Sequence, residues 1–83
     1  MFNELGWTKM PDGKLIKSEE IMTGAVVQGV IEEVDDAWIA TLFLVDEDDL
    51  EIASARVEAM SHMEAMIYAD NLWVGLVVIG RSV

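Results

Sequence analysis

The chain contains no cysteine, so several kinds of chemistry are excluded from the start. No disulfide can stabilise the fold, and no thiol can act as a nucleophile or thiolate ligand. The fold must therefore depend on the burial of apolar side chains. A chain without cysteine suits a reducing compartment, and we expect a cytoplasmic location.

Positive charge is also scarce, with 5 Lys and Arg against 16 Asp and Glu and a net charge of −11. Such a polyanion repels nucleic acid and anionic membranes, so we expect neither as a direct partner and favour a basic protein instead. The imbalance is local, because no Lys or Arg occurs between Ser18 and Ala55. That window holds most of the acids: Glu19, Glu20, Glu32, Glu33, Asp35, Asp36, Asp46, Glu47, Asp48, Asp49 and Glu51.

The sequence has little that resembles a leader or a membrane span. The first residues, MFNELGW, carry no basic segment followed by an apolar one, which predicts that they are not a signal peptide. The longest apolar run lies at residues 73–80, whereas a helical span needs about 20 residues. We therefore expect no direct contact with a membrane.

Apolar residues are abundant for such an acidic chain, at 53% of 83 residues. This share argues against disorder. The length fits one small domain, so we expect residues 1–83 to form a single domain with a modest core.

Turn signals predict two hairpins. The segment MPDGK places Pro11, Asp12 and Gly13 in the order that a tight turn needs, between strands near residues 5–10 and 14–18. Residues rich in Val, Ile and aromatic side chains then predict a second hairpin, with Asp35 and Asp36 at its tip. Gly24 and Gly29 indicate a bend or a bulge in this region.

A helix is predicted next, from about residue 48 to about residue 71. Asp48 and Glu51 have the spacing of a capping pair, and Ser54 is a competing cap. The expected apolar stripe, in steps of three and four, is Ala53, Val57, Met60, Met63 and Ile67.

A final strand is expected at residues 73–79. The order is then ββββαβ, an α+β fold in which one helix packs on a two-layer antiparallel sheet of four to five strands. One helix covers one face only, yet the predicted strand at residues 37–45 is apolar on both faces. Three candidates remain for the second face: the N-terminal segment with Phe2 and Trp7, a second copy of the chain, or a different partner.

Motifs for catalysis or metal binding are incomplete. VDEDDLE resembles a calcium loop, but Leu50, Glu51 and Val57 stand where an EF-hand needs an oxygen ligand, a glycine and a glutamate. GAVVQGVI has the glycine spacing of a phosphate loop without its Lys and Ser or Thr. His62 is the one histidine, and Ser61 beside it points about 100° away on a helix. We expect no metal, no cofactor and no enzymatic activity.

The acids remain as the best candidate site. One cluster lies at the second hairpin's tip and another follows that hairpin, about 30 Å away along the strand. They could form an extended negative track that replaces nucleic-acid phosphates, or they could only keep an apolar protein in solution. Trp38, next to the tip, is a candidate aromatic anchor. The predicted partner-binding residues are Glu32, Glu33, Asp35, Asp36, Trp38, Asp46, Glu47, Asp48, Asp49 and Glu51.

The segment SARVEAMSHMEAMIYADNL looks like the S-x-x-E-A-M-x-x-A helices of small phage and toxin–antitoxin proteins. In size, acidity and lack of cysteine the chain resembles small phage-encoded inhibitors of the anti-CRISPR type. The resemblance implies, in the host-cell cytoplasm, binding to a CRISPR effector and a block of target DNA or of nuclease recruitment. Two alternatives remain: a structural or homo-oligomeric module, and an antitoxin-like neutraliser of a basic toxin.

Overall fold

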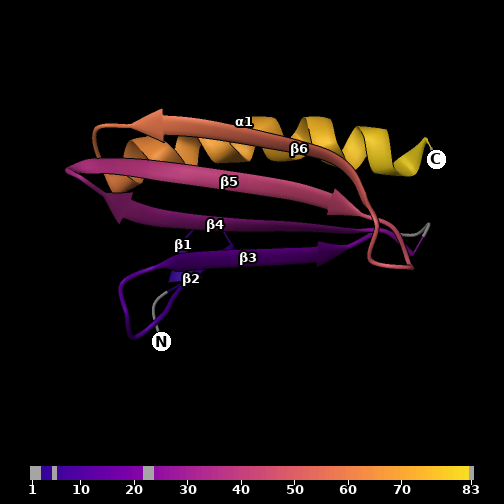
Figure 1. The fold of residues 1–83 in the computed structure, drawn as a ribbon, viewed down its shortest axis with the longest axis horizontal. Coiled ribbons are helices and arrows are strands. Elements are labelled where there is room, and N and C mark those ends of the chain that lie inside the picture. The colour runs from indigo at the N-terminus through magenta and orange to yellow at the C-terminus, as the bar shows by residue number, and fades with distance from the viewer. Residues whose placement is uncertain (1–2, 5, 22–23, 83) are drawn as a thin grey trace.

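The computed structural model describes residues 3–4, 6–21 and 24–82. These residues form six strands followed by one helix (Figure 1). The elements are β1 (Asn3–Glu4), β2 (Trp7–Lys9), β3 (Leu15–Glu20), β4 (Val26–Val34), β5 (Ala37–Val45), β6 (Glu51–Ala59) and α1 (His62–Arg81).

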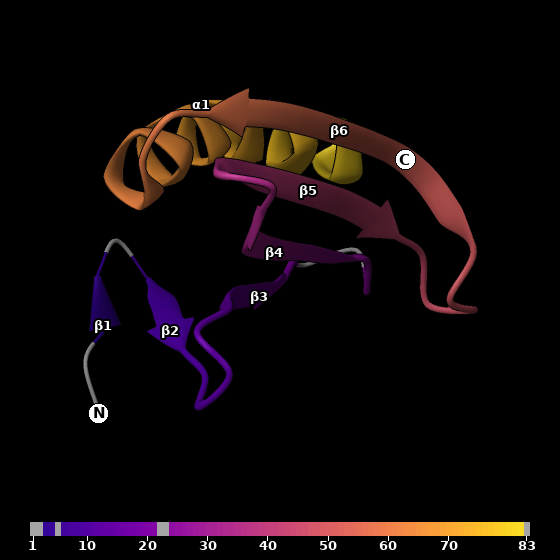
Figure 2. The ribbon, with the colours of Figure 1, turned by 60° about the vertical axis from the view of Figure 1, so that its left-hand side comes forward.

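The strands form one sheet in chain order, and each pairs antiparallel with its neighbours. The sheet curves, and α1 lies on its concave side (Figure 2). α1 packs against β4, β5 and β6. The predicted α+β class, a two-layer antiparallel sheet with one helix packed on it, is confirmed.

Both predicted hairpin turns are present. At the first, the Gly13 amide donates to the Met10 carbonyl at 2.9 Å and the Lys14 amide to Asp12 Oδ1 at 3.1 Å, while Gly13 has a φ of 93°. At the second, Asp35 and Asp36 have φ values of 51° and 67°. Two successive left-handed residues match the twist of a two-residue hairpin, and Asp tolerates that conformation better than most residues.

The predicted helix start is wrong. Residues 51–59 form β6, which pairs with β5, and the helix begins after Ser61. The Ser61 hydroxyl accepts a hydrogen bond from the Glu64 amide at 3.2 Å, and Glu64 Oε1 accepts one from the Met60 amide at 3.2 Å. This is a variant of the capping box that the sequence SHME encodes, in which the glutamate accepts from the amide one residue before the N-cap.

The predicted last strand is also wrong, because residues 73–79 belong to α1. The helical period explains this result: buried side chains recur at Ala65, Ala69, Trp73 and Leu76, in steps of three and four. Val74, Val78 and Ile79 are exposed on other faces of the helix, and Val77 packs partly against the core.

Methionine packing differs from expectation in the same region. Met60 and Met63, which the expected helical stripe placed in the core, are 83% and 40% exposed. Met66 is buried instead, because it lies on the helix face that packs against the sheet.

Two indoles fill the centre of the core over a glycine. Trp7 and Trp73 pack edge to face, with ring centroids 5.8 Å apart. A Cβ on Gly29 would lie 2.6 Å from Trp7 and 2.7 Å from Leu42. Gly29 pairs in register with Leu42 and makes no bulge, so its role is to leave room for the rings. Gly24, with a φ of 88°, lies in the turn between β3 and β4.

A polar network joins α1 to β3 beside these rings. Lys17 Nζ lies 3.0 Å from Asp70 Oδ1 and 4.6 Å from the centre of the Trp73 ring. The Trp73 indole N–H donates to Glu19 Oε1 at 2.9 Å. The Lys17 side chain is only 17% exposed, so water screens this ion pair less than an ordinary surface pair. The network thereby fixes the helix on the sheet.

Candidate protein-binding face

The first acidic cluster lies at the end of the β4–β5 hairpin. We call it the tip cluster, and it consists of Glu32, Glu33, Asp35 and Asp36. Glu33, Asp35 and Asp36 are exposed, and Glu32 is partly exposed, 3.6 Å from Lys14 Nζ. The two-residue turn crowds these carboxylates at one end of the molecule.

The second acidic cluster lies in the β5–β6 connection and at the start of β6. We call it the loop cluster, and it consists of Asp46, Glu47, Asp48, Asp49 and Glu51. Asp46 Oδ1 accepts hydrogen bonds from the Asp48 amide at 2.8 Å and the Leu50 amide at 3.0 Å. Asp49 has a left-handed φ of 63°. The cluster is therefore an ordered hairpin loop, and the expectation that Asp48 caps a helix is wrong.

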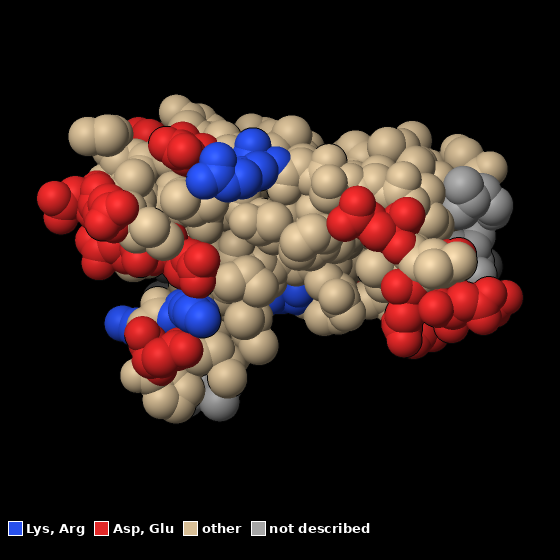
Figure 3. Space-filling model, in the orientation of Figure 1, with Lys and Arg blue, Asp and Glu red and all other residues tan. Residues whose placement is uncertain are grey.

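The structure does not bring the two clusters together. They lie at opposite ends of β5, whose nine residues span about 30 Å at 3.4 Å per residue. The longest dimension of the molecule is 36 Å. Figure 3 shows acidic side chains at both ends of one face, with a mostly uncharged band between them.

The band is the convex face of the sheet, which we call the open face. Among the described residues no element covers it, since α1 lies on the other side. Trp7, one candidate for this cover, lies in the core on the helix side with no exposed surface, and Phe2 lies outside the described residues. The apolar residues and the threonine on the open face, all half-buried or exposed, are Ile16, Val26, Val30, Ile39, Thr41, Phe43 and Val45. By strand register, Gln28, Ser54, Arg56 and Glu58 lie on the same face.

Trp38, the predicted aromatic anchor, does not belong to the open face. It alternates with Ile39 and so faces the helix side, where its ring lies 5.5 Å from the His62 ring. It is partly buried and packs against the core. The aromatic residue within the open face is Phe43, which is not among the predicted partner-binding residues.

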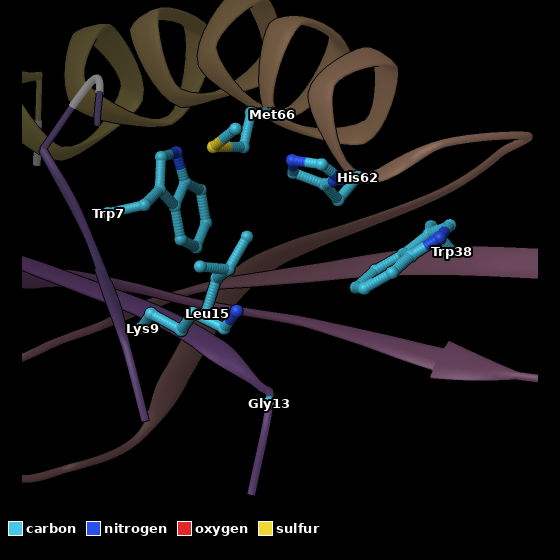
Figure 4. Close-up of a pocket in the computed structure, with 7 residues that line it drawn as sticks. All are labelled: Trp7, Lys9, Gly13, Leu15, Trp38, His62 and Met66. Atoms are coloured by element: carbon cyan, nitrogen blue, oxygen red, sulfur yellow. The ribbon is translucent and has the colours of Figure 1, made fainter. Parts of the chain in front are cut away.

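A cavity of about 260 Å³ lies between the tip-cluster end of the sheet and the first turn of α1. Figure 4 shows its lining: Trp7, Lys9, Gly13, Leu15, Trp38, His62 and Met66. The volume is below the range of about 300–1,000 Å³ typical of small-molecule pockets. The lining offers one amine, from Lys9, and one imidazole, from His62, and no carboxylate or hydroxyl.

The next question is whether the described residues could form a metal site. Within residues 3–4, 6–21 and 24–82, no group of three or more His, Asp or Glu side chains could hold a metal ion. The lone imidazole packs beside an indole at the start of the helix.

Helix α1 is long and apolar enough to cross a membrane by length and composition alone, with 20 residues and a mean hydropathy of 1.3 over its best window. It is longer than the apolar run expected from the sequence, because the preceding turns continue the same helix. In the structure one face of α1 packs on the sheet, and a core helix meets the same criteria. The absence of a membrane partner stays a prediction.

Comparison of the chain with protein-family models, with curated proteins and with solved structures finds no match. The function must therefore be argued from the surface itself. The acidic clusters were visible in the sequence, and so was the two-sided apolar character of residues 37–45. The face of the sheet that stays uncovered cannot be read from the sequence, because it depends on where α1 packs.

Proposed function

We propose that the protein is a non-enzymatic binding protein that docks its open face on a basic partner, with the tip and loop clusters against basic patches at either end. One observation carries this proposal: an uncovered apolar sheet face is bounded by acids at both ends. An apolar centre within a charged rim is the usual anatomy of a protein interface. Phe43 is the central aromatic anchor of this face.

The charge distribution favours a basic partner and raises the rate at which the two proteins associate. Carboxylates at the ends attract a basic surface over long distances, and the largely apolar centre supplies the contact that excludes water. If the acids served solubility alone, they could be spread over the whole surface. Instead, on the face shown in Figure 3, they lie mainly at its two ends.

A nucleic-acid-binding protein is the class of partner that fits this spacing best. The clusters are about 30 Å apart along β5, close to the roughly 34 Å of one turn of B-DNA. Phosphates on the same side of a duplex recur at that interval. Carboxylates at the two ends would thus replace phosphates one turn apart, which is how an inhibitor of the anti-CRISPR type, in the cytoplasm of a host cell, would block a nucleic-acid-binding complex.

Affinity capture at two salt concentrations tests this proposal. We expect the captured proteins to be basic, and their binding to fall by at least tenfold between low salt and about 1 M salt, where the Debye length shrinks to roughly 3 Å. Binding that is unchanged at high salt would exclude electrostatic attraction as the main contribution.

Charge reversal identifies which acidic cluster contributes to binding of the partner. Glu32→Lys with Glu33→Lys reverses the tip cluster, and Glu47→Lys with Asp48→Lys reverses the loop cluster. These positions avoid the left-handed residues at the two turns, where lysine would add strain. We expect both reversals to weaken capture. Val74→Lys with Val78→Lys, which adds charge on α1 away from the sheet, is the matched control, and equal losses in all three variants would contradict the assignment.

A further inference from the structure

The last strand of the sheet has an unpaired edge. β6 spans nine residues and is the terminal strand, so among the described residues only β5 pairs with it. From Ala53 to Ala59 its register with β5 is continuous, and the irregularity lies at the other end, between Leu44 and Val45. A long regular edge without proline is a surface on which a further strand can pair.

Apolar side chains of α1 flank this same edge. Tyr68 and Met60 line a groove of about 220 Å³ together with Glu58 and Ala59 of β6. At 100° per residue, Leu72 and Ile79 lie on the same side of the helix as Tyr68. These three helix residues are 37–44% exposed, and Met60 is 83% exposed.

The opposite side of α1 faces β3, as the contact between Asp70 and Lys17 shows. The apolar flank and the free strand edge are therefore continuous with each other. Arg56 and Glu58 pair in register with Thr41 and Ile39, so their side chains lie at the β6 margin of the open face. We call them together the β6 surface: Arg56, Glu58, Met60, Tyr68 and Leu72.

The charges on β6 are complementary to themselves. Arg56 and Glu58 lie two residues apart on the same face of the strand, with Val57 between them, and their side chains are 58% and 59% exposed. When two copies of β6 pair antiparallel about Val57, each Arg56 lies opposite Glu58 of the other copy. Opposite charges that face each other across a strand pair stabilise it, and like charges destabilise it.

We propose that the protein forms a two-fold symmetric homodimer in which the β6 edges of two copies pair antiparallel about Val57. The pairing extends the sheet and sets the apolar flanks of the two α1 helices on the same side, facing each other across the axis. A self-complementary surface of this kind is what a two-fold interface requires. The open face remains free in the dimer, so the homodimer does not depend on the proposed function.

Sedimentation velocity on the full chain tests the proposal directly. Over a range from low to high micromolar concentration, we expect a species of twice the 9.2 kDa chain mass. Arg56→Glu should weaken the dimer at least tenfold, because it places like charges across the axis. The double variant Arg56→Glu with Glu58→Arg restores the pairing with the charges exchanged and should recover the dimer.

Matched variants on α1 identify the flank involved. Tyr68→Lys, beside β6, should weaken the dimer, whereas Val74→Lys, on the β3 side of the same helix and 64% exposed, should leave it intact. Circular dichroism confirms that each variant is folded. A monomer at the highest concentration would overturn the proposal, and so would a dimer that resists Arg56→Glu. Loss of the dimer in Phe43→Lys with full retention in Arg56→Glu would place the second copy on the open face instead.

Discussion

At the scale of single residues, Gly29 sets the packing of the core. Side chains from β2, β5 and α1 converge there, and a methyl group would meet Trp7, Leu42 and Trp73 at 2.6–3.0 Å. We predict that Gly29→Ala lowers the free energy of unfolding by about 1–3 kcal/mol, the usual cost of overpacking. Urea denaturation followed by tryptophan fluorescence measures this change.

Gly75→Ala is the matched control for that substitution. Gly75 lies in α1, and no atom would come within 4 Å of an added Cβ. Alanine has the higher helix propensity, so this variant should be as stable as the parent or up to about 1 kcal/mol more stable. Equal destabilisation in the two variants would contradict the close packing described at Gly29.

Lys17 is a second residue on which stability depends. Its amine pairs with Asp70 and lies over the Trp73 ring in a site where the lysine side chain is 17% exposed. Lys17→Ala leaves that carboxylate partly buried without its cation, so we predict a loss of about 1–3 kcal/mol in the free energy of unfolding. Lys14→Ala, which removes a 49% exposed lysine, should change it by less than about 1 kcal/mol. Similar losses in the two variants would refute a special role for Lys17.

At the scale of elements, the start of α1 depends on the capping box. Ser61→Ala removes the hydroxyl that accepts the Glu64 amide, and we predict a loss of about 1 kcal/mol, measured by urea denaturation with circular dichroism. Ser54→Ala is the control, since Ser54 is exposed on β6 and caps nothing. A larger loss in Ser54→Ala would favour the helix start that the sequence first suggested.

The hairpins could be predicted from the sequence because their signals are local. Pro-Asp-Gly and Asp-Asp specify their turns through the backbone conformations of two or three residues. Residues 51–59 could not be assigned in this way. Ala53 and Val57 fit a helical step of four, and they also alternate with Ser54, Arg56 and Glu58 on a strand. Pairing with β5 decides between helix and strand, and this pairing is a tertiary contact that the local sequence does not encode.

Residues 73–79 show the opposite error: they were predicted to form a strand, and they are helical. Residues 73–79 are rich in β-branched side chains, which favour a strand, yet they continue a helix. The capping box at Ser61 and the buried spacing from Ala65 to Leu76 outweigh local propensity. A search for capping boxes would have placed this helix correctly, because SHME matches the motif.

At the scale of the whole molecule, a net charge of −11 opposes the compact state through self-repulsion. Added salt screens that repulsion, so we predict that the melting temperature rises between about 10 mM and 0.15 M ionic strength, where the Debye length falls from roughly 30 to 8 Å. Asp48→Asn with Asp49→Asn removes two loop-cluster charges and keeps a side chain that tolerates the left-handed φ of Asp49. This variant should melt higher at low salt and respond less to added salt. A melting temperature that falls with salt would contradict the role of repulsion.

The candidate site could be predicted only in part for a physical reason. Charge follows directly from residue type, so the two acidic clusters could be located in the sequence. Exposure is a property of packing, so Trp38 was assigned to the surface although it faces the helix side, and Phe43 was not. The free edge of β6 could not be foreseen once that segment was assigned to a helix.

The central claim is that the open face, with acids at its two ends, binds a basic partner. Affinity capture from a cell lysate with the parent chain, Phe43→Lys and the control Val74→Lys tests this claim most directly. The account predicts that basic nucleic-acid-binding proteins are enriched by the parent and by Val74→Lys and are lost with Phe43→Lys. Capture of the same proteins by all three chains, or their loss with Val74→Lys alone, would contradict it.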